Sequence, residues 1–326
     1  MFDRKRFRAG AVQAEPIWLD ARATVEKTVG IIAEAAESET RLLAFPELWL
    51  PGYPGFMLTH SPTETMPFLL RYRDQSVTVD GPEIETIRAA ARRHGVAVAF
   101  GLSERAGATL YMSQLLIDHD GTVKLHRRKL KPTRFERELF GQGDGSDLQV
   151  CDSSCGRIGA LNCAENLQSL NKFALAAQGE QIHISSWPFP LGSATLTGAS
   201  MCAINQTYAA ENGAFVLMST IVFGQDAIAA FDMAGSGESR QYLGGGYASV
   251  FGPDTSRLSE PIPPTVEGIA YADIDFSLIE RAKHTLDPTG HYARPDVFSV
   301  TIDRRRKPPV TEITDVVDEP FEDAVG

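Results

Sequence analysis

The amino-acid sequence predicts an α/β fold in which two mixed sheets pack face to face between outer helices, a four-layer α-β-β-α sandwich. Stretches with strand and helix periodicity alternate in both halves of the chain, and the second half repeats the scheme of the first. Antiparallel hairpins interrupt this alternation, which disfavours a plain doubly wound parallel sheet. No linker divides the 326 residues, so we expect one large domain over residues 1–303.

In the first half, apolar periodicity predicts in order a strand, a helix, a strand, a helix and a strand, at residues 7–13, 25–36, 41–47, 82–95 and 96–104. The first helix is indicated by apolar side chains at helical spacing, Val25, Val29, Ile32 and Ala36. Pro46 ends the second strand, and Gly95 closes the second helix.

A β-hairpin is expected over residues 111–130, because His119, Asp120 and Gly121 join two strand-like runs and Asp-Gly supplies the positive φ angles of a tight turn. Lys129 then falls at the far end of its second strand. The second half predicts strand, helix, strand, helix and strand, at residues 156–164, 166–180, 181–188, 197–213 and 214–220. A second hairpin is expected from residues 247–252 into residues 267–275.

Composition restricts the classes of function. The net charge is −11, and an acidic surface repels polyanions, which disfavours binding to nucleic acid or to anionic membranes. No apolar h-region follows the charged start, and no apolar run approaches the roughly 18 residues of a membrane helix. We therefore expect a cytoplasmic protein, for which a small or neutral substrate fits better than a polyanion.

The four cysteines, at positions 151, 155, 163 and 202, are few for this length and can all stay reduced. Cys151 and Cys155 resemble half a metal site, but the seven histidines are scattered and no second cysteine pair follows. We expect ordinary thiols at these two positions, and neither a metal nor an organic cofactor.

Glu47 lies in the run AFPELWLPGYP at residues 44–54, directly after a predicted buried strand. Apolar surroundings destabilise the charged form of a carboxyl group, which makes the carboxylate more basic and suits it to proton transfer near neutral pH. Taken alone, the pattern fits a strand-end carboxylate facing water better than a catalytic one.

Lys129 lies in the run HRRKLKPTRFERELFGQGDGSDL at residues 126–148. Alone, the run is typical of a solvated basic strand, and it lacks the interleaved aromatic residues of a nucleic-acid patch. The glycines of GQGDG match neither a dinucleotide-binding fingerprint nor a P-loop, so we expect a sharp loop there.

Cys163 stands between an apolar strand and a helix that opens near Asn166, in the run IGALNCAENLQSL at residues 158–170. A free thiol with a pKa of about 8.5 is only about 3% thiolate at pH 7, so a useful nucleophile needs a base or a cation beside it. Amide groups at the helix start and a neighbouring lysine would supply this. A lone cysteine in such a place is more often a buried structural thiol.

Together, the three runs resemble the nitrilase branch of the nitrilase superfamily, in which a Glu, a Lys and a Cys follow in this order along an α-β-β-α sandwich. FPELWLPGYP is similar to the glutamate segment of the family, RRKLKPTRFERELFGQGDGSDL to its lysine segment, and LNCAEN with AQGEQIHISSWP to its cysteine segment. LDPTGHYARPDVFSV at residues 286–300 resembles the C-terminal motif of the branch. The similarity covers nearly the whole chain.

The resemblance implies Glu47 as general base and acid, Lys129 as cationic partner, Cys163 as nucleophile and Glu136 as a supporting glutamate. Lys129 is preferred to Lys131 because the lysine of the family directly follows the arginine of an Arg-Lys pair. Many nitrilases carry Trp after the cysteine, whereas this chain carries Ala164, whose backbone N–H stays available to stabilise an oxyanion. Aromatic residues near the motifs could line an apolar pocket, namely Trp49, Tyr53, Phe135 and Trp187.

The implied reaction is hydrolysis of a nitrile to the carboxylic acid and ammonia through a covalent thioimidate and thioester, without a cofactor. An amidase or carbamoylase of the same superfamily would use the same triad on a C–N single bond, and a non-catalytic interaction module is a more remote alternative. A Ser-His-Asp hydrolase is disfavoured, because the chain has no G-x-S-x-G elbow.

We also expect a homodimer or a larger spiral homo-oligomer, since sandwiches of this family pair through helices pressed together across a two-fold axis. Residues 304–326 are polar and contain proline, which indicates a C-terminal tail that is mobile or contacts a neighbouring subunit.

Overall fold

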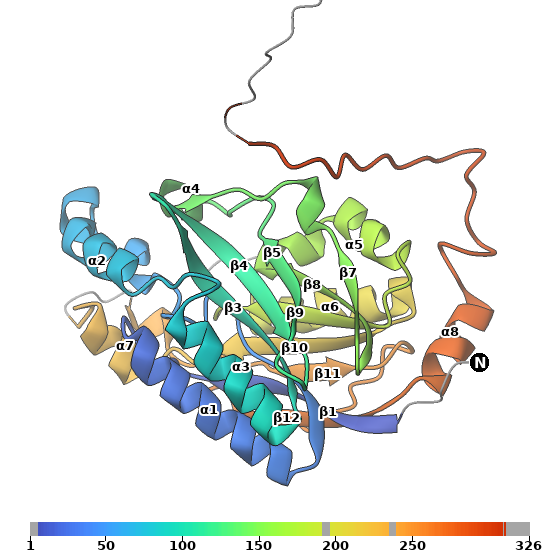
Figure 1. The fold of residues 1–326 in the computed structure, drawn as a ribbon, viewed down its shortest axis with the longest axis horizontal. Helices are drawn as coiled ribbons and strands as arrows, with labels where there is room; N and C mark the ends of the chain where they lie inside the picture. The colour runs from blue at the N-terminus through green and yellow to red at the C-terminus, as the bar shows by residue number, and fades with distance from the viewer. Residues whose placement is uncertain (1–5, 191–195, 235–238, 309, 311–326) are drawn as a thin grey trace, which may run out of the picture.

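The computed structural model describes residues 6–190, 196–234, 239–308 and 310 (Figure 1). Its strands are β1 (Arg6–Ala14), β2 (Thr40–Ala44), β3 (Ala97–Ala106), β4 (Thr109–Ile117), β5 (Val123–Arg128), β6 (Phe140–Gly141), β7 (Val150–Ser153), β8 (Gly156–Asn162), β9 (Ile182–Trp187), β10 (Phe215–Ile221), β11 (Ser249–Phe251) and β12 (Gly268–Asp275).

The α-helices are α1 (Ala21–Glu37), α2 (Pro62–Asp74), α3 (Pro82–His94), α4 (Glu136–Leu139), α5 (Ser169–Ala176), α6 (Gly198–Asn212), α7 (Gln225–Ala230) and α8 (Ser277–Thr285). Short 3-10 helices are η1 (Gly55–Leu58), η2 (Gly145–Asp147), η3 (Cys163–Leu167) and η4 (Ser239–Tyr242). Among the described residues, no helix is both long enough and apolar enough to cross a membrane.

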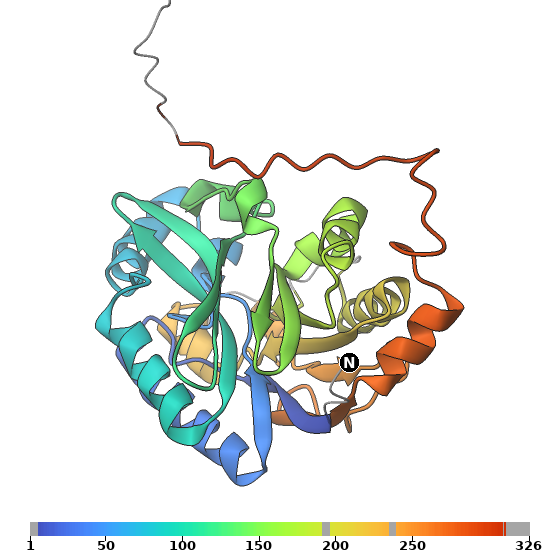
Figure 2. The same cartoon turned by 45° about the vertical axis from the view of Figure 1, so that its right-hand side comes forward.

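The elements form the predicted four layers, with α1 and α3 on one outer face and α5 and α6 on the other (Figures 1 and 2). Helix α1 begins at Asp20, whose carboxylate accepts a hydrogen bond from the Ala23 N–H at 2.9 Å, and its buried Val25 and Ile32 pack on the sheet. Helix α3 ends at Gly95, which has φ +67°. The helices thus cover the two outer faces with apolar stripes.

The strands run in the order β5-β4-β3-β2-β1-β10-β9-β8-β7, and the two predicted sheets are continuous through β1 and β10. These two strands pair only at their last residues, Gln13 with Thr220 and Ala14 with Ile221. From this junction the two halves diverge and face each other. The core between them combines small and branched side chains of both halves, including Ala9, Ala11, Leu42, Ala99, Ile158, Ile184 and Leu217.

The predicted second hairpin is wrong. Strand β11 pairs antiparallel with β10, whereas β12 pairs antiparallel with β1 over its whole length, from Arg6–Asp275 to Gln13–Gly268. Helix α5 also begins at Ser169, after η3, and is shorter than the helix expected over residues 166–180. Helices α2, α7 and α8 and strand β7 were not predicted from the sequence.

Strand direction brings the candidate residues together. Strands β1, β2, β3, β8, β9 and β10 are linked by parallel pairings, so their carboxyl ends lie at one edge of the sandwich. Glu47 follows β2 and Cys163 follows β8. Strand β5 is antiparallel to β4, which is antiparallel to β3, so β5 runs in the same direction as β3 and brings Lys129 to the same edge. Ends of strands are where α/β folds build sites.

Candidate active site

Glu47 is held between two strands by its own backbone. Its N–H donates to the Trp187 carbonyl at 3.3 Å, and the preceding Pro46 carbonyl accepts from the Gly101 N–H at 3.1 Å. A Cβ at Gly101 would lie 2.6 Å from the backbone nitrogen of Leu48, so only glycine lets β3 approach the glutamate segment this closely. The Glu47 side chain is entirely buried.

Lys129 stands one residue beyond β5, and its N–H donates to the Met112 carbonyl at 2.7 Å. Its ammonium group donates to Glu47 Oε1 at 2.8 Å and to Glu136 Oε2 at 2.8 Å. All three side chains are fully buried, so the cation and the two carboxylates form one desolvated cluster. Lys131, the alternative lysine, is exposed and donates to Gln142.

Glu136 begins the short helix α4, and three donors converge on its carboxylate. Besides Lys129, these are the Tyr53 hydroxyl on Oε1 at 2.8 Å and the Thr133 N–H on Oε2 at 2.5 Å. Because a buried carboxylate with three donors is fixed in place, Glu136 also fixes the position of the Lys129 ammonium group.

Cys163 directly follows β8 and has φ +47°, the left-handed region that non-glycine residues seldom occupy. Such a conformation costs about 1 to 3 kcal/mol and persists only when the surroundings hold it. The side chain is 2% exposed. Glu47, Lys129 and Cys163 are close enough that the first two act electrostatically on the third.

Burial and neighbouring charges set the protonation of the cluster. Desolvation, aided by Glu136 and opposed by Lys129, raises the pKa of Glu47 to about 8. Desolvation and the Glu47 charge raise the pKa of the Cys163 thiol, while Lys129 and the Ala164 N–H act to lower it. Burial opposes the charge on Lys129, but Glu136 and Glu47 outweigh it and raise the pKa of the ammonium group.

One oxygen of Glu47 is free for chemistry. Oε1 accepts from Lys129, whereas Oε2 is buried and has no hydrogen-bond partner among the described residues. An unpaired buried carboxylate oxygen next to a thiol can accept the thiol proton. Lys129 donates to the other oxygen, so the cluster combines a thiol, a carboxyl group and a positive charge.

A second buried ion pair, not predicted from the sequence, joins the lysine and cysteine segments. Arg127 donates two hydrogen bonds to Glu165, at 2.9 Å and 2.8 Å. Glu165 also accepts from the backbone N–H groups of Leu130 and Asn162, at 2.8 Å and 2.9 Å. Burial opposes the charge on Glu165, but Arg127 outweighs it and lowers the pKa of Glu165. The only sequence signal was that each residue stands two positions from a triad member.

Four of the five predicted pocket residues lie near the predicted catalytic side chains or their clusters. Tyr53 contacts Glu136 and packs edge-on against Phe135, with ring centroids 6.4 Å apart. Trp187 belongs to the same apolar cluster as Cys163, and Ala164 packs against that cluster.

Trp49, in contrast, lies away from the triad. Its indole N–H donates to the Thr28 hydroxyl of α1 at 2.8 Å, and its ring packs on Phe45 in the core between the sheet and α1. The neighbours of Trp49 are thus those of a core side chain, and none of them is a predicted catalytic residue.

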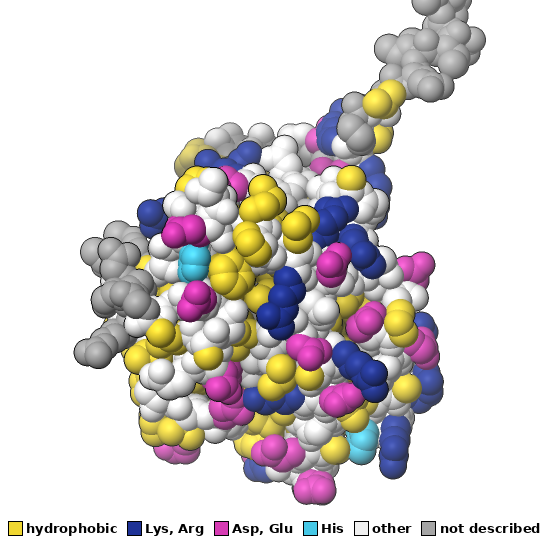
Figure 3. Space-filling model, turned by 90° about the vertical axis from the view of Figure 1, so that its left-hand side faces the viewer, with side chains coloured by type: hydrophobic (Ala, Val, Ile, Leu, Met, Phe, Trp, Pro, Cys, Tyr) yellow, Lys and Arg dark blue, Asp and Glu magenta, His cyan; other side chains and the backbone are white. Residues whose placement is uncertain are grey.

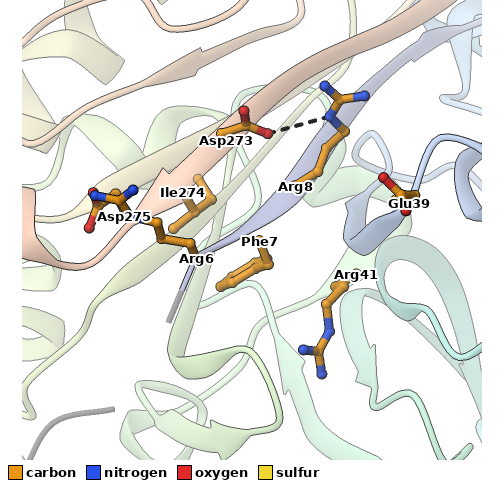
Figure 4. A pocket seen from close by; sticks show the side chains of 8 residues that line it. All are labelled: Arg6, Phe7, Arg8, Glu39, Arg41, Asp273, Ile274 and Asp275. Atoms are coloured by element: carbon orange, nitrogen blue, oxygen red, sulfur yellow. Dashed lines mark hydrogen bonds and ion pairs between the residues drawn. The ribbon is translucent and has the colours of Figure 1, made fainter. Parts of the chain in front are cut away.

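A cavity of about 400 Å³ opens next to the segments that carry Lys129 and Cys163, although neither of these residues lines it. It is lined by residues that flank the triad in sequence, including Leu130, Thr133, Ala164 and Glu165. A second cavity, of about 660 Å³, lies at the other end of the sheet, where β1 and β2 begin. Figure 4 shows its charged lining, with Arg8 bonded to Asp273. This second cavity holds none of the predicted site residues.

Among the described residues, no group of three or more His, Cys, Asp or Glu side chains could hold a metal ion. Cys151 is partly buried and its thiol faces the Ile158 carbonyl, whereas Cys155 is buried and its thiol donates to the Arg41 carbonyl at 3.4 Å.

The chain matches a known family along most of its length. The sequence model of the carbon-nitrogen hydrolase family matches residues 8–284. A bromoxynil-specific nitrilase of Klebsiella pneumoniae subsp. ozaenae is 66% identical over 309 residues, which cover 95% of this chain and 88% of the relative. An aliphatic nitrilase of Rhodococcus rhodochrous is 45% identical over 312 residues, covering 93% of this chain and 84% of the relative.

Solved structures agree on the fold. The C. elegans NitFhit protein superposes with a TM-score of 0.72 at 16% identity, covering 94% of this chain and 69% of that one. A carbon-nitrogen hydrolase from Helicobacter pylori G27 gives a TM-score of 0.69 at 21% identity, covering 90% of this chain and 97% of that one.

Proposed function

The chain belongs to the carbon-nitrogen hydrolase family and is a nitrilase, and from this premise we propose that Glu47, Lys129 and Cys163 form its catalytic triad. The observation that carries the assignment is the buried cluster in which Lys129 bridges Glu47 and Glu136. Burying a cation and two carboxylates is costly, so such clusters occur mainly at functional sites, and this cluster acts electrostatically on the Cys163 thiol.

In the first half-reaction, Glu47 Oε2 accepts the thiol proton and the sulfur of Cys163 adds to the nitrile carbon. The electron pair of the C–N π bond takes the proton back from Glu47, which gives a covalent thioimidate. A base with a pKa of about 8 suits this exchange, because it can both accept and return a proton near neutral pH.

In the second half-reaction, Glu47 removes a proton from a water molecule that adds to the thioimidate carbon. The tetrahedral intermediate is stabilised by the Lys129 charge and the Ala164 N–H, and ammonia leaves after taking up a proton. A second water cleaves the thioester, the acid departs, and the thiolate regains its proton. Overall, one nitrile and two waters give one carboxylic acid and one ammonia.

The similarity to known nitrilases disfavours the two alternative functions. An amidase or carbamoylase would share the triad, but the similar curated sequences are nitrilases over almost their full length. A non-catalytic interaction module is disfavoured for the same reason, and it would not need a buried lysine between two carboxylates.

Trapping and product analysis test the proposal together. The protein is incubated with aliphatic, aromatic and arylacetonitriles, quenched and mapped by mass spectrometry, while acid, ammonia and amide are quantified. We expect an adduct on Cys163, acid as the main product, and far slower hydrolysis of the matching amide. An adduct on another cysteine would overturn the nucleophile assignment, and faster turnover of the amide would restore the amidase alternative.

We further propose that the protein forms a homodimer or a larger homo-oligomer. Support comes from α5 and the end of η3, where Leu167, Leu170 and Phe173 are 49%, 67% and 37% exposed at three-residue spacing. A second apolar area lies on α2, where Met66 and Leu70 are exposed, and Figure 3 shows apolar side chains gathered on that side of the molecule. Such surfaces are typical of interfaces.

Light scattering at micromolar concentration tests this, with matched variants. Leu170→Glu should dissociate the assembly that pairs through α5, whereas Val266→Glu, on an exposed loop, should leave it intact. A monomer in the wild type would refute the proposal. Removing residues 304–326 should shorten any larger assembly. At the described start of this tail, Arg304 and Lys307 donate hydrogen bonds to Leu148 and Asp144 of the same chain; most of the tail lies outside the described residues.

We also propose a cytoplasmic location, supported by the small number of cysteines, four in 326 residues, which can stay reduced there.

A further inference from the structure

The backbone of Cys163 is fixed by a side chain that the reaction itself does not use. The Cys163 carbonyl accepts a hydrogen bond from Asn166 Nδ2 at 2.9 Å. That carbonyl and the Ala164 N–H belong to one planar trans peptide, so they point in opposite directions from the same rigid unit. Whatever fixes the direction of the carbonyl therefore fixes the direction of the N–H that faces the developing oxyanion.

Asn166 is in turn held by a histidine. Its Oδ1 lies 2.8 Å from His183 Nε2. Because the amide nitrogen donates to Cys163, the amide oxygen is the acceptor, and His183 Nε2 must carry a hydrogen. His183 Nδ1 lies 2.8 Å from Glu180 Oε1. The second ring nitrogen thus faces a carboxyl group.

The chain of contacts ends at Tyr208, whose hydroxyl donates to Glu180 Oε2 at 2.6 Å. The Tyr208 ring also stacks on the imidazole, with centroids 3.8 Å apart. A Cβ at Gly159 would overlap Glu180 Oε1, so glycine on β8 is what admits the carboxyl group. The four side chains of Asn166, Glu180, His183 and Tyr208 are all 0% exposed.

This arrangement holds one shared proton. With Nε2 protonated, the contact between His183 Nδ1 and Glu180 Oε1 requires one hydrogen between them, carried by either atom. In both cases the pair has no net charge, which removes most of the cost of burying it. The donor and acceptor of each Asn166 hydrogen bond are therefore fixed. Asn166 cannot flip its amide without breaking its hydrogen bonds to both Cys163 and His183.

We propose that Asn166, His183 and Glu180 are positioning residues that orient the Cys163–Ala164 peptide, so that the Ala164 N–H points at the nitrogen or oxygen that gains negative charge during turnover. This inference rests on the proposed role of Cys163. It explains how a non-glycine residue is kept at φ +47° at the reacting position. The alternative is a purely structural role, in which these hydrogen bonds only hold β8, β9 and α6 together.

Two nearly isosteric variants, at opposite ends of this hydrogen-bond network, distinguish a positioning role from a purely structural one. Asn166→Leu removes the contact with the Cys163 carbonyl, whereas Tyr208→Phe removes the hydroxyl at the far end and keeps the ring stacking. Both leave a buried polar group without its partner, so both should lower the denaturant midpoint. Only Asn166→Leu should lower kcat, by at least 30-fold with KM changed less than threefold. Tyr208→Phe should keep kcat within threefold of wild type.

The reactivity of the thiol gives a second readout, because the Ala164 N–H favours the thiolate. The rate of alkylation of Cys163 by iodoacetamide, followed by peptide mass spectrometry, should fall at least fivefold in Asn166→Leu and less than twofold in Tyr208→Phe. Equal effects of the two variants on kcat and on alkylation would overturn the proposal in favour of a structural role, as would an unchanged kcat in Asn166→Leu.

If Asn166→Leu does not fold, Asn166→Asp takes its place, because it has the same size and loses its donor when it ionises. Its activity relative to wild type should fall as pH rises, and a constant ratio near one from pH 6 to pH 10 would overturn the proposal. The proposed triad is tested separately: full activity in wild-type protein whose Cys163 is alkylated would reject the triad, whatever the two variants do.

Discussion

Replacing Glu136 by Gln removes one negative charge from the cluster while keeping the size of the side chain. In the wild type, Lys129, Tyr53 and Thr133 all donate to this carboxylate. A glutamine can turn its oxygen toward Lys129 and Thr133 and its amide toward Tyr53, whose hydroxyl can accept as well as donate. We therefore expect Glu136→Gln to fold with little loss of stability.

The kinetic effect can be bounded from the distance between charges. At 2.8 Å and an effective dielectric constant of about 20, the attraction between Glu136 and Lys129 is about 6 kcal/mol before screening and desolvation. Only the part that differs between ground state and transition state changes the rate. If a quarter of it does, the loss is about 1.5 kcal/mol, or slightly more than tenfold in kcat, and we take tenfold as the minimum.

The same substitution should also shift the pH dependence of kcat/KM, and the charge that it removes sets the direction of the shift. Glu47 must be deprotonated to accept the thiol proton, so kcat/KM should rise as pH rises through about 8, the pKa to which burial raises Glu47. Glu136 is one of the causes that raise the pKa of Glu47, so its neutralisation should move this rising limb to lower pH.

Steady-state ammonia release from pH 5 to pH 10, with thermal unfolding alongside, measures both effects. Glu138→Gln, an exposed carboxylate of the same short helix, is the matched control and should behave as wild type. If Glu136→Gln turns over within twofold of wild type and its rising limb does not move, Glu136 has no part in the reaction, while the triad assignment stands.

Four further outcomes follow from the site. Cys163→Ala should abolish turnover in a folded protein, whereas Cys151→Ser should keep most activity; residual turnover in the alanine variant would reject the nucleophile. Glu165→Ala should lower the free energy of unfolding by about 3 to 5 kcal/mol in urea titrations, because it leaves Arg127 buried and unpaired; a loss below 1 kcal/mol would contradict this. Ala164→Trp should partly fill the cavity of about 400 Å³ and reduce kcat/KM for bulky aromatic nitriles more than for small aliphatic ones, so an equal loss for both would place substrate elsewhere. Exhaustive EDTA treatment should leave the rate unchanged, and a loss restored by zinc would reopen a metal role.

The sequence by itself determined the elements whose signal is local. Periodicity predicted β1, α1, α3 and the hairpin of β4 and β5, because the side chains that face the core recur along one segment. The resemblance of three motifs to the nitrilase branch led to the family, which the comparisons show. It also distinguished Lys129 from Lys131, and the structure places Lys129 between Glu47 and Glu136.

Only the tertiary structure decided which distant segments meet. Strands β11 and β12 have strand-like patterns of their own, but a pattern does not specify its partner: β11 pairs with the preceding strand β10, and β12 pairs with β1 at the other end of the chain. Trp49 follows Glu47 by two residues, yet it faces α1, because its neighbours are set by packing and not by proximity in sequence. The chain from Tyr208 to Cys163 likewise exists only where β8, β9 and α6 converge. A hydrogen bond needs two groups within about 3 Å. Asn166 and His183 are 17 positions apart and Glu180 and Tyr208 are 28 apart, so only the fold brings each pair within that distance.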